Sequence, residues 1–238
     1  VNIEYKDVKD KLLKSANAGL NLSVAIHEIE KLISSLQSCI TNDDKIRALE
    51  LSIKLDKIVT GYSVMIKKSS MKIIYLSKII NTALDNYSFR FSDHRIDVKV
   101  NYKDKSLEGY FSETESTSII TNILDNSIYW LSFARKEDRQ ISIWVTDEIS
   151  GYHSIIISDN GPGFNMPFDV ATEVFVTGKP HSIGSGLGLH IAKEMMYSMG
   201  GKLKYFDKKD ISFPKEIESN KITNAIIGLC FKIDKDKN

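Results

Sequence analysis

The stretch at residues 154–164, Ser-Ile-Ile-Ile-Ser-Asp-Asn-Gly-Pro-Gly-Phe, places a carboxylate and two glycines directly after a β-rich run. A carboxylate at the end of a strand can accept a hydrogen bond from an exocyclic amine, and glycines let the backbone approach a ligand closely. Asp159, Gly161 and Gly163 are therefore candidate ligand-binding residues. An ordinary Gly-Pro turn would explain the same pattern, and this segment alone does not separate the two interpretations.

A second glycine-rich segment, Gly-Ser-Gly-Leu-Gly-Leu at residues 184–189, leads into a helical pattern expected over residues 188–199. Backbone N–H groups at a helix N-terminus, with the positive end of the helix dipole, suit a phosphate group. The glycine spacing matches neither G-x-G-x-x-G nor G-x-x-x-x-G-K-[ST], which excludes a Rossmann turn and a P-loop. A flexible loop is the plain alternative.

A third group of polar residues lies on a helix expected over residues 112–133, which opens with a capping box, Ser-Glu-Thr-Glu. Asn122, Asn126 and Tyr129 follow at spacings of four and three, so they share one face, and Trp130 lies beside them. Two amides can hold a hydrated Mg²⁺ and phosphate oxygens, and an aromatic ring can stack on a base. Plain solvent exposure of two asparagines is the alternative.

The rest of the second part of the chain alternates between helical and strand patterns. We expect another helix over residues 77–87 and strands over 97–102, 141–145, 154–158, 203–206 and 225–233. This order predicts an α+β fold in which helices pack on one face of a mixed sheet.

The first third of the chain has apolar residues at helical spacing, from about residue 10 to 40 and again from 46 to 66, with a polar turn at residues 41–44. This pattern predicts a helical hairpin. Its apolar stripes need a partner, either the rest of the chain or a second copy, and we favour a dimeric four-helix bundle. We place the domain boundary near residue 70, giving domains at 1–70 and 71–238.

Composition limits the function classes. The 238 residues are 42% hydrophobic and carry 32 Lys and Arg against 31 Asp and Glu, so nothing draws the whole surface to nucleic acid or a membrane. No apolar run approaches the ~20 residues of a spanning helix. Cys39 and Cys230 show no metal or disulfide spacing and should be packing residues in a reducing compartment. The first residue, Val1, suggests a fragment, upstream of which a membrane or sensor segment could lie.

Four segments in a fixed order carry a family resemblance. Residues 122–127, 159–163, 175–179 and 184–189 resemble the N, G1, F and G2 boxes of the GHKL ATPase superfamily, and within it most closely those of sensor histidine kinases. The resemblance implies a Bergerat-type α/β sandwich with a mobile lid over about residues 165–185. Residues 25–31, Ala-Ile-His-Glu-Ile-Glu-Lys, resemble the H-box of the dimerisation and phosphotransfer hairpin.

The resemblance assigns roles to the boxes. It implies that Asp159 binds the adenine amine, that Trp130 stacks on adenine, and that Asn122 and Asn126 hold Mg²⁺ and phosphate. Lys179 and His181 in the lid are further candidate phosphate contacts. The expected ATP-binding residues are Asn122, Asn126, Trp130, Asp159, Gly161, Gly163, Phe175, Lys179, Gly184, Gly186, Leu187 and Gly188.

His27 is the expected phosphoacceptor. At ~100° per residue it points about 160° away from Ile29, in the middle of the apolar stripe, and is presented to solvent. Glu28 would fix the histidine tautomer and accept its proton. The resemblance implies autophosphorylation, transfer to a response regulator receiver domain, and a homodimer in the cytoplasm, as part of a longer sensor protein.

Several residues depart from the pattern of the superfamily. Asn122 stands where the hydrolases carry a glutamate that activates water, which favours transfer to a side chain. Tyr129 stands where many relatives have lysine. Glu30 replaces a basic residue, and Lys31 replaces the Asn or Thr used for dephosphorylating a response regulator, so phosphatase activity is in doubt. A GHKL ATPase, a protein serine kinase and a nucleotide-binding scaffold without transfer chemistry stay open as alternatives.

Overall fold

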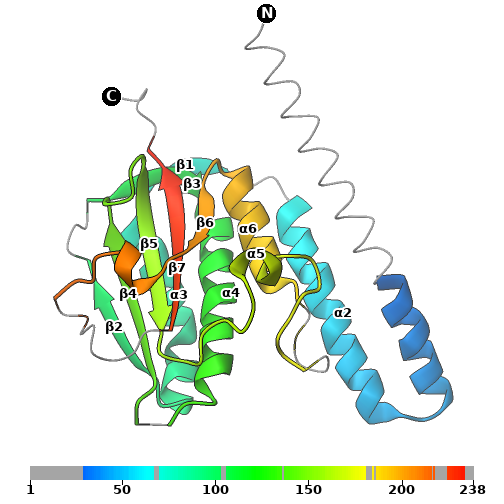
Figure 1. Ribbon diagram of the computed structural model, residues 1–238. Coiled ribbons are helices and arrows are strands. Elements are labelled where there is room, and N and C mark those ends of the chain that lie inside the picture. Colours follow the sequence, from blue (N-terminus) through cyan, green and yellow to red (C-terminus); the bar gives the residue numbers. More distant parts are fainter. Residues whose placement is uncertain are drawn as a thin grey trace, which may run out of the picture. The chain divides into compact units, whose positions relative to one another are not determined.

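The computed structural model describes residues 29–66, 70–102, 106–135, 137–180, 184, 186–215, 217 and 224–233. The described residues divide into two compact units (Figure 1). The first holds the N-terminal helices up to Ser63 together with the segment that begins at Lys179, and the second holds the remainder. No helix among the described residues is long and apolar enough to cross a membrane.

The first unit contains the predicted helical hairpin. One helix runs through residues 29–41, and after a turn the second, α2, spans Lys45–Ile66. Asp43 in the turn has a φ of 55°, and the Asp44 carboxylate accepts a hydrogen bond from Arg47 N at 3.1 Å, as an N-cap residue does. His27 and Glu28 lie outside the described residues.

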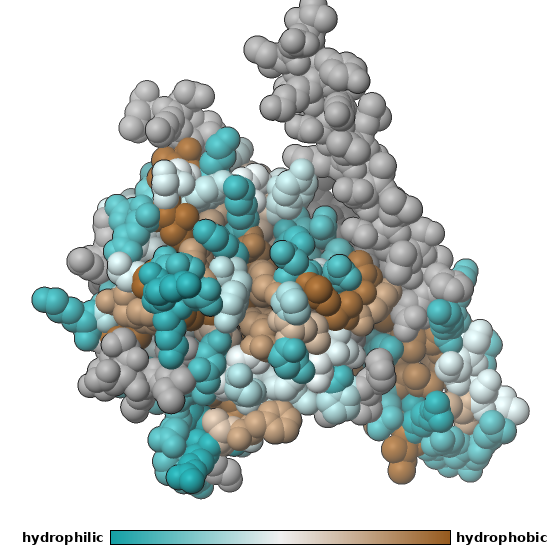
Figure 2. Space-filling view, viewed as in Figure 1, coloured by the Kyte–Doolittle hydropathy of each residue, from teal (hydrophilic) through white to brown (hydrophobic). Residues whose placement is uncertain are grey.

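The described part of the hairpin leaves many of its apolar side chains in solvent, visible as brown surface at the lower right of Figure 2. Ile46 is 78% exposed and Leu49 is 63% exposed, whereas Leu32 is buried. The other exposed apolar residues of the hairpin are Ile33, Ile40, Ile53 and Val59.

The second unit is built on a five-stranded mixed sheet of order β2-β4-β5-β7-β6. Strand β2 pairs with β4 in parallel, and the other three pairs are antiparallel. The strands are β2 (Asp97–Asn101), β4 (Gln140–Thr146), β5 (Tyr152–Asp159), β6 (Lys202–Tyr205) and β7 (Ala225–Lys232). Each of the predicted strands is therefore present, with bounds shifted by one or two residues.

Three helices cover one face of this sheet, as predicted (Figure 1). They are α3 (Leu76–Asp93), α4 (Glu113–Leu131) and α6 (Gly188–Ser198), and α4 packs between the other two. The predicted capping box opens α4, because Ser112 Oγ accepts a hydrogen bond from Glu115 N at 3.2 Å. The register places Ile143, Ile157 and Ile227 side by side, and all three are buried.

The opposite face of the sheet is also covered. Trp144, Ile156 and Cys230 alternate with the residues of the first face and form a second apolar cluster with Phe206 and Ile217 from the connection between β6 and β7. Because both faces are covered, every residue of β4 is buried. The two cysteines, Cys39 and Cys230, are buried and free, as predicted for packing residues.

A small two-stranded sheet was missed by the sequence analysis. Strand β1 (Met71–Tyr75) pairs antiparallel with β3 (Glu108–Ser112), more than thirty residues further along the chain. Lys72 on β1 and Lys78 on α3 both bind the carboxylate of Glu113, at 2.9 and 2.8 Å. The two short helical segments α5 (Phe168–Ala171) and η1 (Lys208–Asp210) were also not predicted.

Candidate nucleotide-binding site

Asp159 ends β5 with its side chain on the helical face of the sheet, where it is only 6% exposed. Ser127 Oγ of α4 donates a hydrogen bond to its Oδ2 at 2.7 Å, and Gly161 N donates to its Oδ1 at 3.0 Å. Burial raises the pKa of Asp159 from 3.8 to about 6, against the lowering effect of these two hydrogen bonds. A carboxylate has about four acceptor positions, so it can still accept an amine.

The loop after Asp159 depends on both of its glycines. A Cβ at Gly161 would lie 2.9 Å from Asp159 Oδ1, and Gly163 has a φ of +79° with Asn224 O 3.0 Å from its Cβ position. The Asn160 side chain ties the loop to β4, because its Oδ1 accepts from Gln140 N at 2.8 Å and its Nδ2 donates to Asp138 O. These contacts fix the conformation of the loop and distinguish it from an ordinary Gly-Pro turn.

Asn122 on α4 faces the start of α6. Its Oδ1 lies 3.6 Å from the Cβ position of Gly188, the first residue of α6. Leu187, the N-cap residue, is buried and as a leucine cannot cap the helix with its side chain. The N–H groups of the first turn of α6 and the Asn122 amide therefore converge on one small region, which suits a phosphate group.

The F-box residue Phe175 packs directly on the second glycine-rich loop. Gly186 has a φ of +68°, and a Cβ there would lie 2.3 Å from the Phe175 carbonyl carbon. Phe175 itself has a φ of 63°, which is uncommon for a residue other than glycine. These two backbone segments can approach this closely only because residue 186 has no side chain.

Trp130 connects the first glycine-rich loop to the F-box segment. Its Cβ lies 3.4 Å from the Cβ position of Gly161, and its Cη2 lies 3.5 Å from that of Gly178. Its ring also contacts Tyr129 in an edge arrangement, with centroids 5.0 Å apart, and Phe133 at 5.9 Å. Tyr129, which stands in place of a lysine, thus belongs to an aromatic cluster with Trp130 and Phe133.

Within the second unit, the structure brings together predicted residues from all four boxes: Asn122, Trp130, Asp159, Gly161, Gly163, Phe175, Gly186, Leu187 and Gly188. Asn126 lies on α4, four residues after Asn122. Lys179 and Gly184 fall in the first unit, where Gly184 N donates to Pro180 O at 3.0 Å, so they are not placed against the others. His27, Glu28 and His181 lie outside the described residues, and their roles remain predictions.

Sequence reasoning missed three residues of the site: Ser127, Asn160 and Asn224. A signal existed for Ser127, because it stands at helical spacing from Ile123 and Leu124, on the buried side of α4, where a hydroxyl needs a partner. No local pattern marks Asn224, which approaches the loop only through the pairing of β5 with β7.

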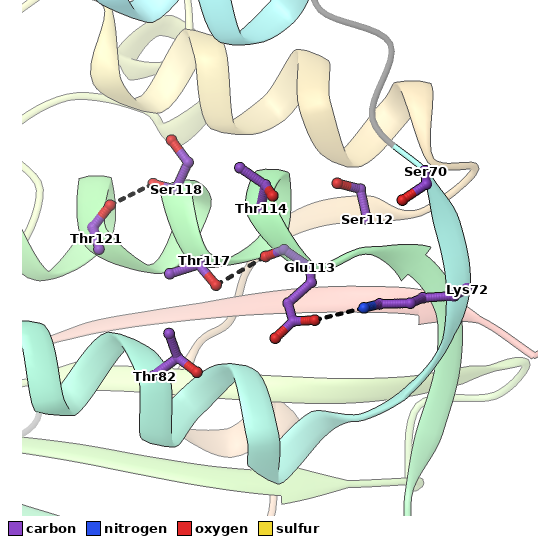
Figure 3. Close-up of a pocket in the computed structure, with 9 residues that line it drawn as sticks. All are labelled: Ser70, Lys72, Thr82, Ser112, Glu113, Thr114, Thr117, Ser118 and Thr121. Carbon is purple, nitrogen blue, oxygen red and sulfur yellow. Dashed lines mark hydrogen bonds and ion pairs between the residues drawn. The ribbon is translucent and has the colours of Figure 1, made fainter.

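A separate cavity of about 560 Å³ lies over the N-terminal half of α4, between β1 and α3 (Figure 3). Its hydroxyl-rich lining is largely satisfied within its own helices: Thr117 donates to Glu113 O at 2.8 Å and Thr121 donates to Ser118 O at 2.9 Å. The lining includes neither Asp159 nor any residue of the glycine-rich loops, so this cavity is distinct from the candidate site.

Comparison with known proteins agrees with this geometry. The family model of the histidine kinase-, DNA gyrase B-, and HSP90-like ATPases matches residues 111–232, about half of the chain. The chain belongs to this ATPase family. The matched range holds α4, both glycine-rich loops and the strands that carry them, and therefore spans all four predicted boxes.

The chain is similar to a curated histidine protein kinase and to a curated transport sensor protein. The chain is 25% identical over 156 residues to histidine protein kinase SaeS of Staphylococcus aureus, covering 63% of the chain and 44% of SaeS. It is 27% identical over 132 residues to the C4-dicarboxylate transport sensor protein DctB of Pseudomonas aeruginosa, covering 55% of the chain and 21% of DctB. The chain thus spans less than half the length of these relatives.

Solved structures show the same fold. The Acinetobacter baumannii histidine kinase AdeS superposes with a TM-score of 0.61 at 15% identity, covering 87% of the chain and 98% of AdeS. Histidine kinase ThkA, solved in complex with response regulator TrrA, superposes with a TM-score of 0.66 at 14% identity, covering 99% of the chain and 67% of ThkA. The predicted α+β fold and the resemblance to a sensor histidine kinase core are confirmed.

Proposed function

We propose that this ATPase-family chain is an ATP-dependent protein histidine kinase core, which autophosphorylates His27 and donates the phosphoryl group to a response regulator. The observation that carries the proposal is the buried Asp159 carboxylate, which accepts a hydrogen bond from Ser127 Oγ at 2.7 Å and lies beside the Gly161 loop and Trp130. A buried carboxylate with spare acceptor capacity, close to the Trp130 side chain, suits the exocyclic amine of adenine.

The adenine end of the site would use Asp159 and Trp130. An amino group on the base would donate to the carboxylate, in place of water, and the Trp130 ring supplies a flat apolar surface for stacking. Because Ser127 Oγ and Gly161 N already occupy part of the carboxylate, its orientation is set before a ligand arrives. This favours selective binding of a base that carries an amine donor.

The phosphate end would use Asn122, Asn126 and the first turn of α6. The uncapped N–H groups after Leu187 would donate hydrogen bonds to negative phosphate oxygens, and the close packing of Gly186 on Phe175 gives the loop its shape. Amide oxygens of the two asparagines fit Mg²⁺, which binds oxygen ligands and keeps several waters. The ion would supply charge neutralisation of the phosphates.

The transfer step would move the γ-phosphoryl group of ATP to His27. A ring nitrogen of His27 would form a bond to the γ-phosphorus as the bond from that phosphorus to the bridging oxygen of ADP breaks. The other ring nitrogen carries the proton, which would pass to Glu28, so the phosphohistidine is neutral at its ring. Asn122 cannot act as a general base toward water, which supports transfer to a side chain over hydrolysis.

Two partners follow from the proposal. The exposed apolar stripe of the hairpin, with Ile46, Leu49 and Ile53 at least half exposed, supports a homodimer through a four-helix bundle. A response regulator receiver domain is the proposed acceptor, supported by the solved complex of the fold neighbour ThkA with response regulator TrrA. With Lys31 on the hairpin, we do not propose phosphatase activity.

The test is incubation of the purified chain with γ-labelled ATP and Mg²⁺, beside a His27→Gln variant. We expect a protein-bound label that is stable to base, labile to acid and absent from the variant. Equal labelling of both proteins, or an acid-stable label, would contradict the assignment of His27. A chain that binds ATP but takes up no label would favour the nucleotide-binding scaffold, for which the aromatic replacement at Tyr129 is the supporting observation.

A further inference from the structure

Asn224, the residue directly before β7, contacts the first glycine-rich loop at its beginning. Its backbone N–H donates to Asp159 O at 2.9 Å, which extends the β5–β7 ladder by one hydrogen bond. Any residue other than proline could make this backbone contact. The contact nevertheless places the side chain of residue 224 beside the loop that follows Asp159.

The side chain of Asn224 holds the middle of the same loop. Its Nδ2 donates to Gly161 O at 2.5 Å. The N–H of Gly161 donates in turn to Asp159 Oδ1 at 3.0 Å. The Gly161 residue is therefore held on both sides, by the Asp159 carboxylate through its N–H and by the Asn224 amide through its carbonyl.

The end of the loop also packs on Asn224. The Cβ position of Gly163 lies 3.0 Å from Asn224 O, so the two backbones are in close contact there. Tyr205 of β6 donates its hydroxyl to the same Asn224 O at 3.3 Å, and the Tyr205 ring stacks on Phe168 with centroids 5.7 Å apart. One residue thus contacts the loop at Asp159, Gly161 and Gly163.

We propose that Asn224 is a positioning residue for base recognition, which orients the Asp159 carboxylate through the backbone of Gly161. The inference rests on the proposed function, because it assumes that Asp159 meets an adenine amine. Without the Nδ2 donor, the Gly161 carbonyl loses its partner and the backbone of Gly161 can shift, which weakens the hydrogen bond from Gly161 N to the carboxylate. Asn224 touches neither phosphates nor the reacting histidine in this scheme.

The scheme predicts a pattern across ligands. A residue that orients the base-binding carboxylate should affect AMP and ATP by the same factor, because both contain adenine. A residue that shapes the phosphate end should affect ATP more strongly than AMP. This ratio separates positioning of the base from an effect on the phosphate end of the site.

The experiment compares Asn224→Asp with the unsubstituted chain and with Asn86→Asp, measuring the affinity for AMP and for Mg-ATP by calorimetry. Asn224→Asp has the same shape but lacks the donor, and Asn86 is an exposed α3 residue that undergoes the same chemical change. We expect the Kd for both nucleotides to rise about three- to ten-fold for Asn224→Asp and to stay unchanged for Asn86→Asp.

Unchanged affinity in Asn224→Asp, or a loss confined to ATP, would overturn the proposal. If that variant does not fold, Asn224→Ala removes the donor without adding a charge and carries the same expectation. A chain that labels His27 while Asn224→Asp binds both nucleotides normally would leave the proposed function intact and refute this inference alone. Failure of the unsubstituted chain to bind either nucleotide would refute both.

Discussion

Replacing Asp159 by Asn should stabilise the ligand-free protein while weakening its affinity for ATP. Burial raises the pKa of Asp159 from 3.8 to about 6, so between these pH values the folded protein holds a proton that the unfolded chain has released. The free energy of unfolding therefore falls as the pH rises through this window. Above about pH 6 the folded state bears the full cost of the buried charge.

The size of the stability gain follows from the raised pKa of Asp159. At roughly 1.4 kcal/mol per pKa unit, the cost of the ionised carboxylate is about 3 kcal/mol. An asparagine can keep the hydrogen bond to one of its two partners, Ser127 or Gly161, and loses about 1 kcal/mol for the other. The variant should therefore gain about 2 kcal/mol at pH 7.5, which corresponds to roughly 4–8 °C in Tm.

The assay is thermal unfolding of both proteins from pH 4.5 to 8, with and without Mg-ATP. Without nucleotide, the Tm advantage of Asp159→Asn should be largest above pH 6 and shrink as the pH falls toward 4. With nucleotide, only the unsubstituted chain should be stabilised strongly, and its affinity should weaken below about pH 6 as the carboxylate takes up a proton. A variant that is less stable at pH 7.5, or whose advantage does not change with pH, would refute the reasoning.

Two further predictions concern the second glycine-rich loop and the hairpin. Gly186→Ala should abolish ATP binding, because its Cβ would overlap the Phe175 carbonyl carbon at 2.3 Å. The control Gly151→Ala has a similar φ of +81° and nothing within 4 Å of its Cβ position. It should lower the free energy of unfolding by only about 1 kcal/mol and bind ATP normally. Equal effects of the two changes on ATP affinity would contradict this. Leu49→Glu changes a position on the hairpin that is 63% exposed. It should shift a homodimer toward monomer in light scattering without lowering the Tm of the second unit. An unchanged mass would exclude this apolar stripe from the dimer interface.

The sequence alone indicated the strands of the main sheet, the three helices on its face and the four glycine- and asparagine-containing boxes. The alternating run at residues 97–102 and the β-rich run at residues 154–158 were recognisable as strands, and the capping box at Ser112 marked the start of α4, because these signals lie within a few neighbouring residues. The glycines at 161, 163, 186 and 188 were recognisable for the same reason. Only residues without a side chain suit loops that meet another backbone or a ligand.

The tertiary structure alone decided which of these segments meet and what supports them. Ser127 reaches Asp159 because α4 packs on β5, and Asn224 reaches Gly161 because β7 pairs with β5, across more than sixty residues of chain. The raised pKa of Asp159 likewise comes from burial by distant segments. Such contacts depend on strand pairing and helix packing between residues far apart in the chain, and no local pattern encodes them.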